Sequence, residues 1–254
     1  MILRVSLRGE ILALGKIESG AFIACSGRGA GDVSIILPLD PYGAVIGVDL
    51  DASSLYVNAS GSVGYYDYGY RAGRLNTIGP HTVDYYEYGY RAGFANRFGS
   101  YQLDYYEYGY RAGRVSQIGP YQFDYYEYGT RAGMVSKVGS CSVEYYEYGY
   151  RAGKVSTIGS RSVDYYEYGY RAGKVSSLFG VAVDYYEYGY RTGKVCKIGA
   201  TTVDYYEYGN RAGKASKIGA DSVDYNSDGS LSRLGSASVG YYDYGAHRGK
   251  IAHV

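Results

Sequence analysis

The sequence predicts an all-β protein of tandem antiparallel β-hairpins, because it repeats one short phrase rich in strand and turn residues. The phrase is twenty residues long, reads VDYYEYGYRAGKVSxIGxxS, and recurs eight times. Such a fixed period indicates one structural unit stacked many times. Tyrosine and valine favour strands, glycine at constant offsets favours turns, and no window has helical apolar spacing. The copies start at Val63, Val83, Leu103, Phe123, Val143, Val163, Val183 and Val203.

Three segments follow from this pattern. Residues 1–62 lack the phrase but contain short apolar runs, so we expect an N-terminal β cap of degenerate repeats that covers one sheet edge. Residues 63–222 hold the eight tyrosine-rich hairpin repeats, and residues 223–254 hold a short repeat and a C-terminal cap repeat. Because long open sheets coil, we expect an elongated, coiled meander or superhelix. The cap strands are expected at 21–25, 33–37, 44–50 and 54–59.

The short ninth unit predicts the hairpin register. Asp228-Gly229 lies between two alternating segments, which is typical of a two-residue turn with positive φ at both positions. Folding the chain about this turn defines the cross-strand partners. The expected pairs are Val223 with Leu234, Asp224 with Arg233, Tyr225 with Ser232 and Asn226 with Leu231.

The same register can be applied to a long unit, where Val163 faces Leu178, and Glu167 faces Lys174 across a loop at 169–172. Opposite charges across a hairpin are favourable, whereas a parallel solenoid would stack like charges, so antiparallel hairpins are preferred. Six of the eight long units place an acid opposite a base. These expected pairs are Asp67–Arg74, Glu107–Arg114, Glu147–Lys154, Glu167–Lys174, Glu187–Lys194 and Glu207–Lys214.

Two tyrosine faces result from this register. Tyr165 shares a face with Val163 and Leu178, whereas Tyr166 and Tyr168 share the opposite face with Val175. The second face of the short unit is mostly polar, which favours the Tyr165 face inside and the Tyr166/Tyr168 stripe outside. Regular aromatic rows can stack on sugar rings or pack on one another. The candidate ligand-binding stripe is Tyr66, Tyr68, Tyr86, Tyr88, Tyr106, Tyr108, Tyr126, Tyr128, Tyr146, Tyr148, Tyr166, Tyr168, Tyr186, Tyr188, Tyr206 and Tyr208.

Other functional classes find little support in the sequence. The net charge is +1, which provides no field for nucleic acid, and arginine at the loop tips reads as solvated. Three histidines and three cysteines fall in no nucleophile, zinc or disulfide pattern, so we expect no enzyme, metal site or cofactor. No run approaches the roughly 20 apolar residues of a membrane helix, and the first residues do not resemble a signal peptide. The compartment is not assigned, although a cell-surface structure reached by another export route fits these observations.

The short unit resembles the YD repeat of Rhs- and teneurin-type proteins, whose pattern is roughly Y-D-x-x-G-R-L-x-x-I. Tyr225, Gly229, Leu231 and Leu234 match that spacing, whereas Asn226 and Ser230 replace its Asp and Arg. This resemblance implies a spiral sheet of hairpins that can wrap a cargo. The period is also similar to the aromatic hairpins of choline-binding and clostridial toxin repeats. That likeness implies choline or glycan binding in aromatic cages, but tryptophan is absent here.

We therefore expect a non-enzymatic structural repeat protein that acts as a scaffold or assembles edge to edge into a filament. In such a filament, the final GKIAHV of one chain would pair with the MILRVSL segment of a neighbour. The alternative is a carbohydrate-binding or cell-wall-binding module that uses the tyrosine stripe.

Overall fold

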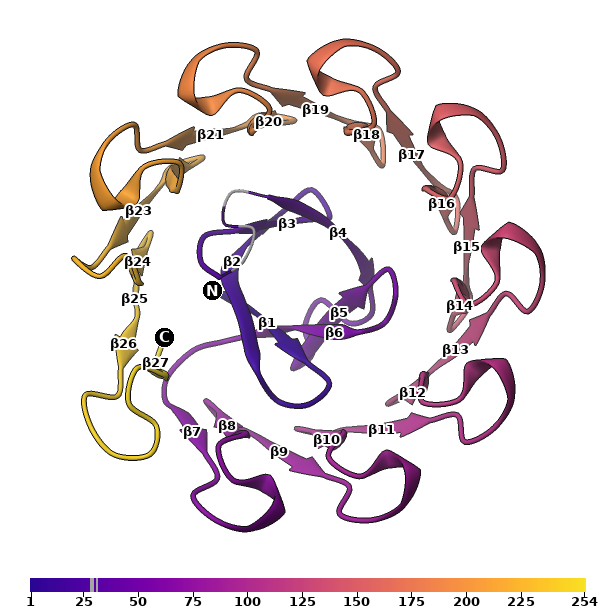
Figure 1. The fold of residues 1–254 in the computed structure, drawn as a ribbon, viewed down its shortest axis with the longest axis vertical. Coiled ribbons are helices and arrows are strands. Elements are labelled where there is room, and N and C mark those ends of the chain that lie inside the picture. Colours follow the sequence, from indigo (N-terminus) through magenta and orange to yellow (C-terminus); the bar gives the residue numbers. More distant parts are fainter. Residues whose placement is uncertain (28–29, 31) are drawn as a thin grey trace.

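A ring of antiparallel β-hairpins surrounds a small six-stranded β-barrel (Figure 1). The structure, a computed structural model, describes residues 1–27, 30 and 32–254. The chain forms the central barrel first and then winds once around it, from the purple strands at residue 63 to the yellow strands near residue 254. Within the described residues there is no α-helix, only eight short 3₁₀ turns. The predicted all-β array of tandem hairpins is confirmed.

Residues 1–62 form a β unit as expected, but it is a closed barrel inside the ring and, in the part that the structure describes, covers no sheet edge, so its expected role as an edge cap is wrong. Each strand is antiparallel to its neighbours, and β1 pairs with both β2 and β6, which closes the barrel. The four apolar segments expected as strands overlap β3 to β6, and only β4 extends beyond its segment, by one residue. The barrel strands are β1 (Ile2–Ser6), β2 (Ile11–Glu18), β3 (Ala21–Ala24), β4 (Val33–Pro38), β5 (Val45–Asp49) and β6 (Ser54–Asn58).

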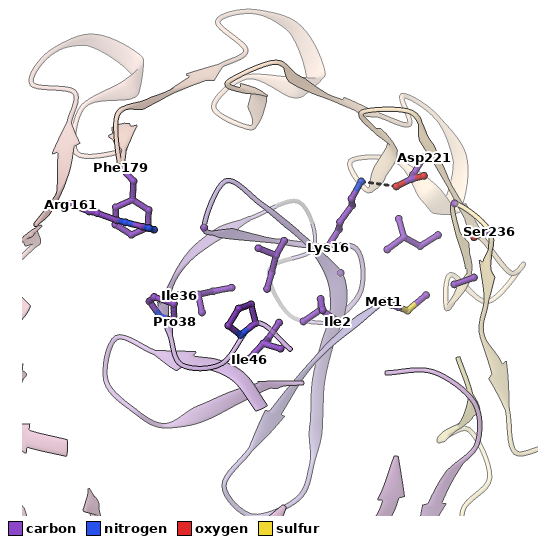
Figure 2. Close-up of a pocket in the computed structure, with 17 residues that line it drawn as sticks. Met1, Ile2, Lys16, Ile36, Pro38, Ile46, Arg161, Phe179, Asp221 and Ser236 are labelled. Carbon is purple, nitrogen blue, oxygen red and sulfur yellow. Dashed lines mark hydrogen bonds and ion pairs between the residues drawn. The ribbon is translucent and has the colours of Figure 1, made fainter. Parts of the chain in front are cut away.

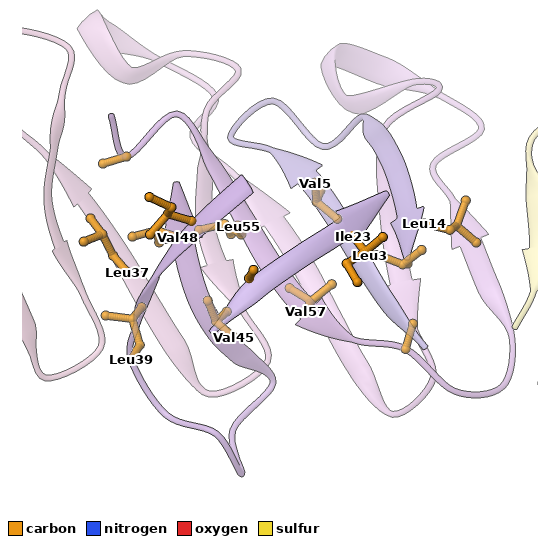
Figure 3. Close-up of a cluster of buried hydrophobic side chains, with 14 of the residues drawn as sticks. Leu3, Val5, Leu14, Ile23, Leu37, Leu39, Val45, Val48, Leu55 and Val57 are labelled. Carbon is orange, nitrogen blue, oxygen red and sulfur yellow. The ribbon is translucent and has the colours of Figure 1, made fainter. Parts of the chain in front are cut away.

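The barrel is apolar on both faces. Its outer face carries side chains such as Leu3, Val5 and Val57, which belong to the same core as the ring (Figure 3). Its interior holds Phe22 and Tyr56, whose ring centroids are 5.0 Å apart. Strands buried on both sides read as near-continuous apolar runs, which explains why residues 1–62 lack the alternation of the repeats.

A buried polar cluster lies among these barrel side chains. The Arg4 guanidinium donates to Asp49 Oδ2 over 2.7 Å, and the Tyr56 hydroxyl donates to Asp49 Oδ1 over 2.5 Å. Ser54 also contacts the Asp49 carboxylate. Burial and the adjacent Asp49 carboxylate raise the pKa of the Tyr56 hydroxyl. A buried carboxylate is tolerated when it is paired in this way, so the cluster has a structural role.

Each long unit of the ring contributes one hairpin and one link. A strand of up to five residues leads into a loop with a 3₁₀ turn, and a four-residue strand returns to a two-residue turn. The ring strands are β7 (Val63–Tyr65), β8 (Leu75–Ile78), β9 (His81–Tyr85), β10 (Ala95–Phe98), β11 (Tyr101–Tyr105), β12 (Val115–Ile118), β13 (Tyr121–Tyr125), β14 (Val135–Val138), β15 (Cys141–Tyr145), β16 (Val155–Ile158), β17 (Arg161–Tyr165), β18 (Val175–Leu178), β19 (Val181–Tyr185), β20 (Val195–Ile198), β21 (Thr201–Tyr205), β22 (Ala215–Ile218), β23 (Asp221–Tyr225), β24 (Leu231–Leu234), β25 (Ala237–Ser238), β26 (Gly240–Tyr241) and β27 (Ile251–His253). The 3₁₀ turns are η1 (Gly69–Arg71), η2 (Gly89–Arg91), η3 (Gly109–Arg111), η4 (Gly129–Arg131), η5 (Gly149–Arg151), η6 (Gly169–Arg171), η7 (Gly189–Arg191) and η8 (Gly209–Arg211).

The expected register is right at the base of each hairpin and wrong near the loop. Val163 pairs with Leu178 and Asp164 with Ser177, as predicted, but a β-bulge then places Tyr165 opposite Val175. One extra residue on the returning strand moves Val175 onto the face of Tyr165. Both side chains thereby face the barrel, whereas the predicted register put them on opposite faces.

The short unit contains the same bulge. Val223–Leu234 and Asp224–Arg233 are confirmed, but Tyr225 pairs with Leu231 and not with Ser232, so the predicted pairing of Asn226 with Leu231 is also wrong. Its turn spans residues 226–230. Gly229 N donates to the Asn226 carbonyl, and Asn226 N donates to the Ser230 carbonyl. Of the two predicted turn residues only Gly229 has positive φ, +85°. A type I turn followed by a left-handed glycine fits this geometry better than the expected two-residue turn.

The bulge also removes the predicted acid–base pairs within each hairpin. Tyr166 N donates to the Lys174 carbonyl, and Gly173 N donates to the Tyr166 carbonyl, so the ladder ends at Tyr166. Glu167 therefore belongs to the loop and does not lie opposite Lys174. None of the six predicted pairs is among the ion pairs of the described residues.

The sheet closes on itself, where an open, elongated coil was expected. β26 pairs with β27, Ser62 forms a bridge with His253, and Gly61 and Val254 exchange two main-chain hydrogen bonds of 2.6 and 3.0 Å. Sheet twist accumulates over many strands, and the apolar barrel fills the space that the curved sheet encloses. The strand edges expected to join neighbouring chains are thus paired within one chain.

The inner face of the ring provides most of the core. Val163 and Leu178 are fully buried and Tyr165 is 9% exposed, which confirms that this face points inward. The buried hydroxyl of Tyr105 donates to the Ala95 carbonyl over 2.9 Å. A large aromatic side chain can be buried at low cost when its polar end is bonded in this way.

Candidate binding surface on the rim

The loops of the repeats project outward from the ring and form its rim (Figure 1). In the first loop, Gly69 has φ +75° and Gly73 has φ +77°. A Cβ on Gly69 would meet nothing within 4 Å, so the glycine is needed for its left-handed backbone and not for space. Ala72 N donates to the Gly69 carbonyl over 3.1 Å, which fixes the 3₁₀ turn that follows Tyr68.

Tyr66 and its equivalents in the other units join neighbouring repeats. The Tyr66 hydroxyl lies 2.9 Å from both of its acceptors, the Val83 carbonyl and Asp84 Oδ1. Its ring meets the Tyr85 ring edge to face, with centroids 6.2 Å apart. Partial burial, and then the bond to Asp84, raise the pKa of Tyr66. The other seven equivalents, which bond to the corresponding carbonyl of the next unit, are Tyr86, Tyr106, Tyr126, Tyr146, Tyr166, Tyr186 and Tyr206.

Arginine at the loop tip is a partner in the same contact. Arg71 Nη1 lies 3.0 Å from Asp84 Oδ1, and its guanidinium carbon lies 4.1 Å from the Tyr66 ring centroid. The interpretation of a solvated loop tip is therefore wrong, because the arginine pairs with the acid of the next unit. Six further units repeat this pairing: Arg91–Asp104, Arg111–Asp124, Arg131–Glu144, Arg151–Asp164, Arg171–Asp184 and Arg191–Asp204.

The lysine of the returning strand also reaches into the next unit. Lys194 Nζ donates to the Gly213 carbonyl over 2.6 Å and lies 5.1 Å from the Tyr205 ring centroid. Lys154 and Lys174 make the equivalent contacts with Gly173 and Gly193. The base that was expected to pair within its hairpin thus bonds a main-chain oxygen of its neighbour.

Tyr68 and its equivalents, which we call the rim tyrosines, project into solvent. The exposed fraction of these side chains lies between 78% and 88%. Where a hydrogen bond is formed it is local, such as that from the Tyr88 hydroxyl to Glu87 Oε1 over 2.7 Å. This bond raises the pKa of Tyr88. The nine rim tyrosines in the described residues are Tyr68, Tyr88, Tyr108, Tyr128, Tyr148, Tyr168, Tyr188, Tyr208 and Tyr244.

The predicted stripe therefore divides into two sets with different surroundings. The Tyr66 set is half buried and bonded between repeats, whereas the Tyr68 set is exposed. A third set, which starts at Tyr70, was not predicted. The Tyr70 side chain is 41% exposed, and its hydroxyl donates to the Tyr85 carbonyl over 3.0 Å.

Among residues 1–27, 30 and 32–254, no group of three or more His, Cys, Asp or Glu side chains is placed to hold a metal ion. No helix of sufficient length and apolar character to cross a membrane occurs in the same residues.

The fold and its rim define a closed ring of tandem β-hairpin repeats around a β-barrel. No protein-family model matches the chain, and no curated protein matches its sequence.

Proposed function

We propose that the protein is a non-enzymatic scaffold whose rigid ring presents tyrosine-bearing loops to a partner at several points. The rim tyrosines support this proposal. Nine large aromatic side chains lie outside the core at 78–88% exposure, while the other tyrosines of each unit are packed or bonded. Because these side chains contribute little to folding, their repetition indicates contact with something outside the chain.

Regular spacing adds to this proposal. Each loop leaves the ring at the same point of its unit, and the contacts of Tyr66 and Arg71 with the next unit hold adjacent loops in one geometry. Several weak contacts that form together give higher affinity than any one contact, provided that their spacing fits the partner. Because the strand edges are paired within the ring, self-association of the protein would take place through the rim loops.

Sedimentation velocity and electron microscopy test the scaffold role. The purified protein should appear as closed ring-shaped particles that associate further as concentration rises. The variant in which Tyr108, Tyr128, Tyr148 and Tyr168 are changed to serine should form the same rings without further association. A control with Tyr106 changed to phenylalanine should keep both properties. Open fibres, or rings that fail to form in the four-site variant, would contradict the proposal.

A second candidate is binding of a glycan or cell-wall polymer along the rim. The supporting observation is the row of exposed rim tyrosines, in which Tyr88, for example, stands beside the Glu87 carboxylate. Aromatic faces stack on the apolar faces of sugar rings, and the adjacent Glu87 carboxylate can accept from hydroxyl groups. A polysaccharide pull-down should retain the protein, and the four-site serine variant should be lost from the pellet. Equal retention of both proteins would exclude this site.

A further inference from the structure

A cavity of about 540 Å³ lies at one mouth of the central barrel, between the barrel and the ring (Figure 2). Ile2, Ile36 and Ile46 of the barrel form one side, and Phe179 and Leu234 of the ring form the other. Sites for small ligands commonly have this volume, a mostly apolar lining, and a place in the mouth of a β-barrel. The cavity is far from the rim loops in the fold, so its role is separate from the proposed scaffold function.

Phe179 breaks the repeat at this cavity. Every other long unit has glycine at the corresponding link position, namely Gly79, Gly99, Gly119, Gly139, Gly159, Gly199 and Gly219. Phe179 keeps the left-handed backbone of those glycines, with φ +56°. A bulky residue with left-handed backbone angles is strained, and backbone strain of this kind is concentrated at functional sites.

The phenylalanine ring is held over the barrel. It lies against the turn between β2 and β3, where a Cβ on Gly20 would approach Phe179 Cε2 to 2.7 Å. The Arg161 guanidinium carbon lies 5.5 Å from the centroid of the same ring. The exceptional residue is thus placed as a wall of the cavity, with a cation beside it.

Lys16 and Arg161 are the two side-chain cations of the cavity lining, and among the described residues only Lys16 has an acidic partner. Lys16 Nζ is paired with Asp221 at 2.7 Å and with Glu18 at 2.8 Å. Arg161 is an exposed side chain at the edge of the cavity, and it forms no ion pair within the described part of the chain. A ligand with a single negative charge would complete this arrangement, because charge-assisted bonds from guanidinium to carboxylate are strong and directional.

We propose that the barrel mouth binds a small amphipathic carboxylate, a short-chain to medium-chain aliphatic acid. The apolar chain lies against Ile36, Ile46 and Phe179, and the carboxylate accepts hydrogen bonds from Arg161. Binding needs both the apolar walls and the guanidinium, because the walls bury the aliphatic chain and the guanidinium selects the negative charge of the ligand.

Isothermal titration with octanoate, and with 1-octanol as the uncharged match, tests this site. The wild-type protein should bind octanoate saturably at one site and bind 1-octanol about tenfold more weakly, the loss expected for one charge-assisted hydrogen bond. Arg161→Gln should lower octanoate affinity to that of 1-octanol and leave 1-octanol unchanged. Phe179→Gly restores the glycine found in the other links, and it should lower the affinity for both octanoate and 1-octanol.

The matched control is Arg248→Gln, which removes an exposed rim arginine and should bind octanoate like the wild type. Circular dichroism of each variant checks that the ring is folded. Absence of saturable octanoate binding in the folded wild-type protein would overturn the proposal. Equal octanoate affinity of Arg161→Gln and the wild type would overturn it as well. Both outcomes are independent of whether the rim binds a partner.

Discussion

The hydroxyl of Tyr146 donates to the main-chain carbonyl of Val163, 3.0 Å away in the next repeat. The same contact recurs from unit to unit, so the outer face of the ring is held together by tyrosine hydroxyls as well as by strand pairing. Because the acceptor is a main-chain oxygen, its presence does not depend on which side chain the next unit carries.

Changing Tyr146 to phenylalanine should destabilise the protein. The substitution removes bonds to the Val163 carbonyl and Asp164 Oδ1, and one such bond contributes about 1 kcal/mol. Urea unfolding should show this decrease in the free energy of unfolding. Tyr148→Phe is the control, since Tyr148 is 84% exposed and should change stability by less than about 0.5 kcal/mol. Equal effects at both positions would contradict the assigned contact.

Changing Gly169 to alanine should destabilise the loop through its backbone alone. Gly169 has φ +73°, and an added Cβ would meet nothing within 4 Å. The left-handed conformation costs a residue with a Cβ about 1–2 kcal/mol. The measurement is thermal unfolding, with Ala172→Ser in the same exposed loop as a control that should be neutral. An unchanged midpoint for Gly169→Ala would show that the loop relaxes to another conformation.

Changing Leu103 to alanine should have a larger effect than either substitution on the outer face. Leu103 is fully buried where the ring meets the barrel. Removing a buried leucine side chain costs about 2–5 kcal/mol, because apolar contact is lost and a cavity remains. Denaturant unfolding followed by circular dichroism measures the decrease. A loss below about 1 kcal/mol would mean that the ring does not pack tightly on the barrel.

Alkaline pH should unfold the protein in a window set by its buried tyrosines. Burial raises the pKa of Tyr165 to about 12, and burial with the bond to Asp204 raises that of Tyr186 to about 12. In the unfolded chain the pKa is about 10. The folded state therefore favours the neutral phenol, and its contribution to stability is complete below about pH 10 and lost as pH rises towards 12.

Ultraviolet absorbance of tyrosinate can follow this transition together with circular dichroism. We expect the buried tyrosines to ionise with loss of β structure, in one cooperative step. Ionisation of all tyrosines near pH 10 with intact circular dichroism would contradict the burial of the Tyr165 face.

Deleting one whole unit, residues 143–162, should destabilise the ring. The barrel has a fixed circumference, and the closing contacts of Gly61 with Val254 and of Ser62 with His253 require a matching ring. An open array would become shorter by one unit and stay folded. A closed ring with one unit missing must either distort its strand pairing or open. Hydrogen exchange at Val254 N should become fast in the deletion variant. The Tyr148→Phe variant should keep slow exchange there.

The fixed period and the base of the hairpin were predictable because they depend on local spacing. Val163 opposite Leu178 follows from alternation and turn position alone. The bulge at Tyr165 was not predictable, because strand alternation and turn position contain no signal for the extra residue that moves Val175 to the inner face of the ring. Closure by His253 and Ser62 likewise depends on the curvature of the whole sheet.

The candidate site was predictable only in part. The sequence indicated an aromatic stripe, but Tyr66 and Tyr68 differ by two residues and would share a face of a regular strand. The ladder ends at Tyr66, and the loop then turns Tyr68 into solvent while Tyr66 bonds the next unit. Phe179 was visible in the sequence as the single replacement of a link glycine, yet the adjacent barrel mouth was not.

The position of the barrel inside the ring has a consequence for biosynthesis. The barrel strands precede the repeats in the chain, so they leave the ribosome before the strands that will enclose them. Until β7 to β27 have wound around it, the outer face of the barrel with Leu3, Val5 and Val57 is open to water. Translation thus passes through a stage in which this apolar surface is still uncovered, and we infer that chaperone contact is concentrated at that stage.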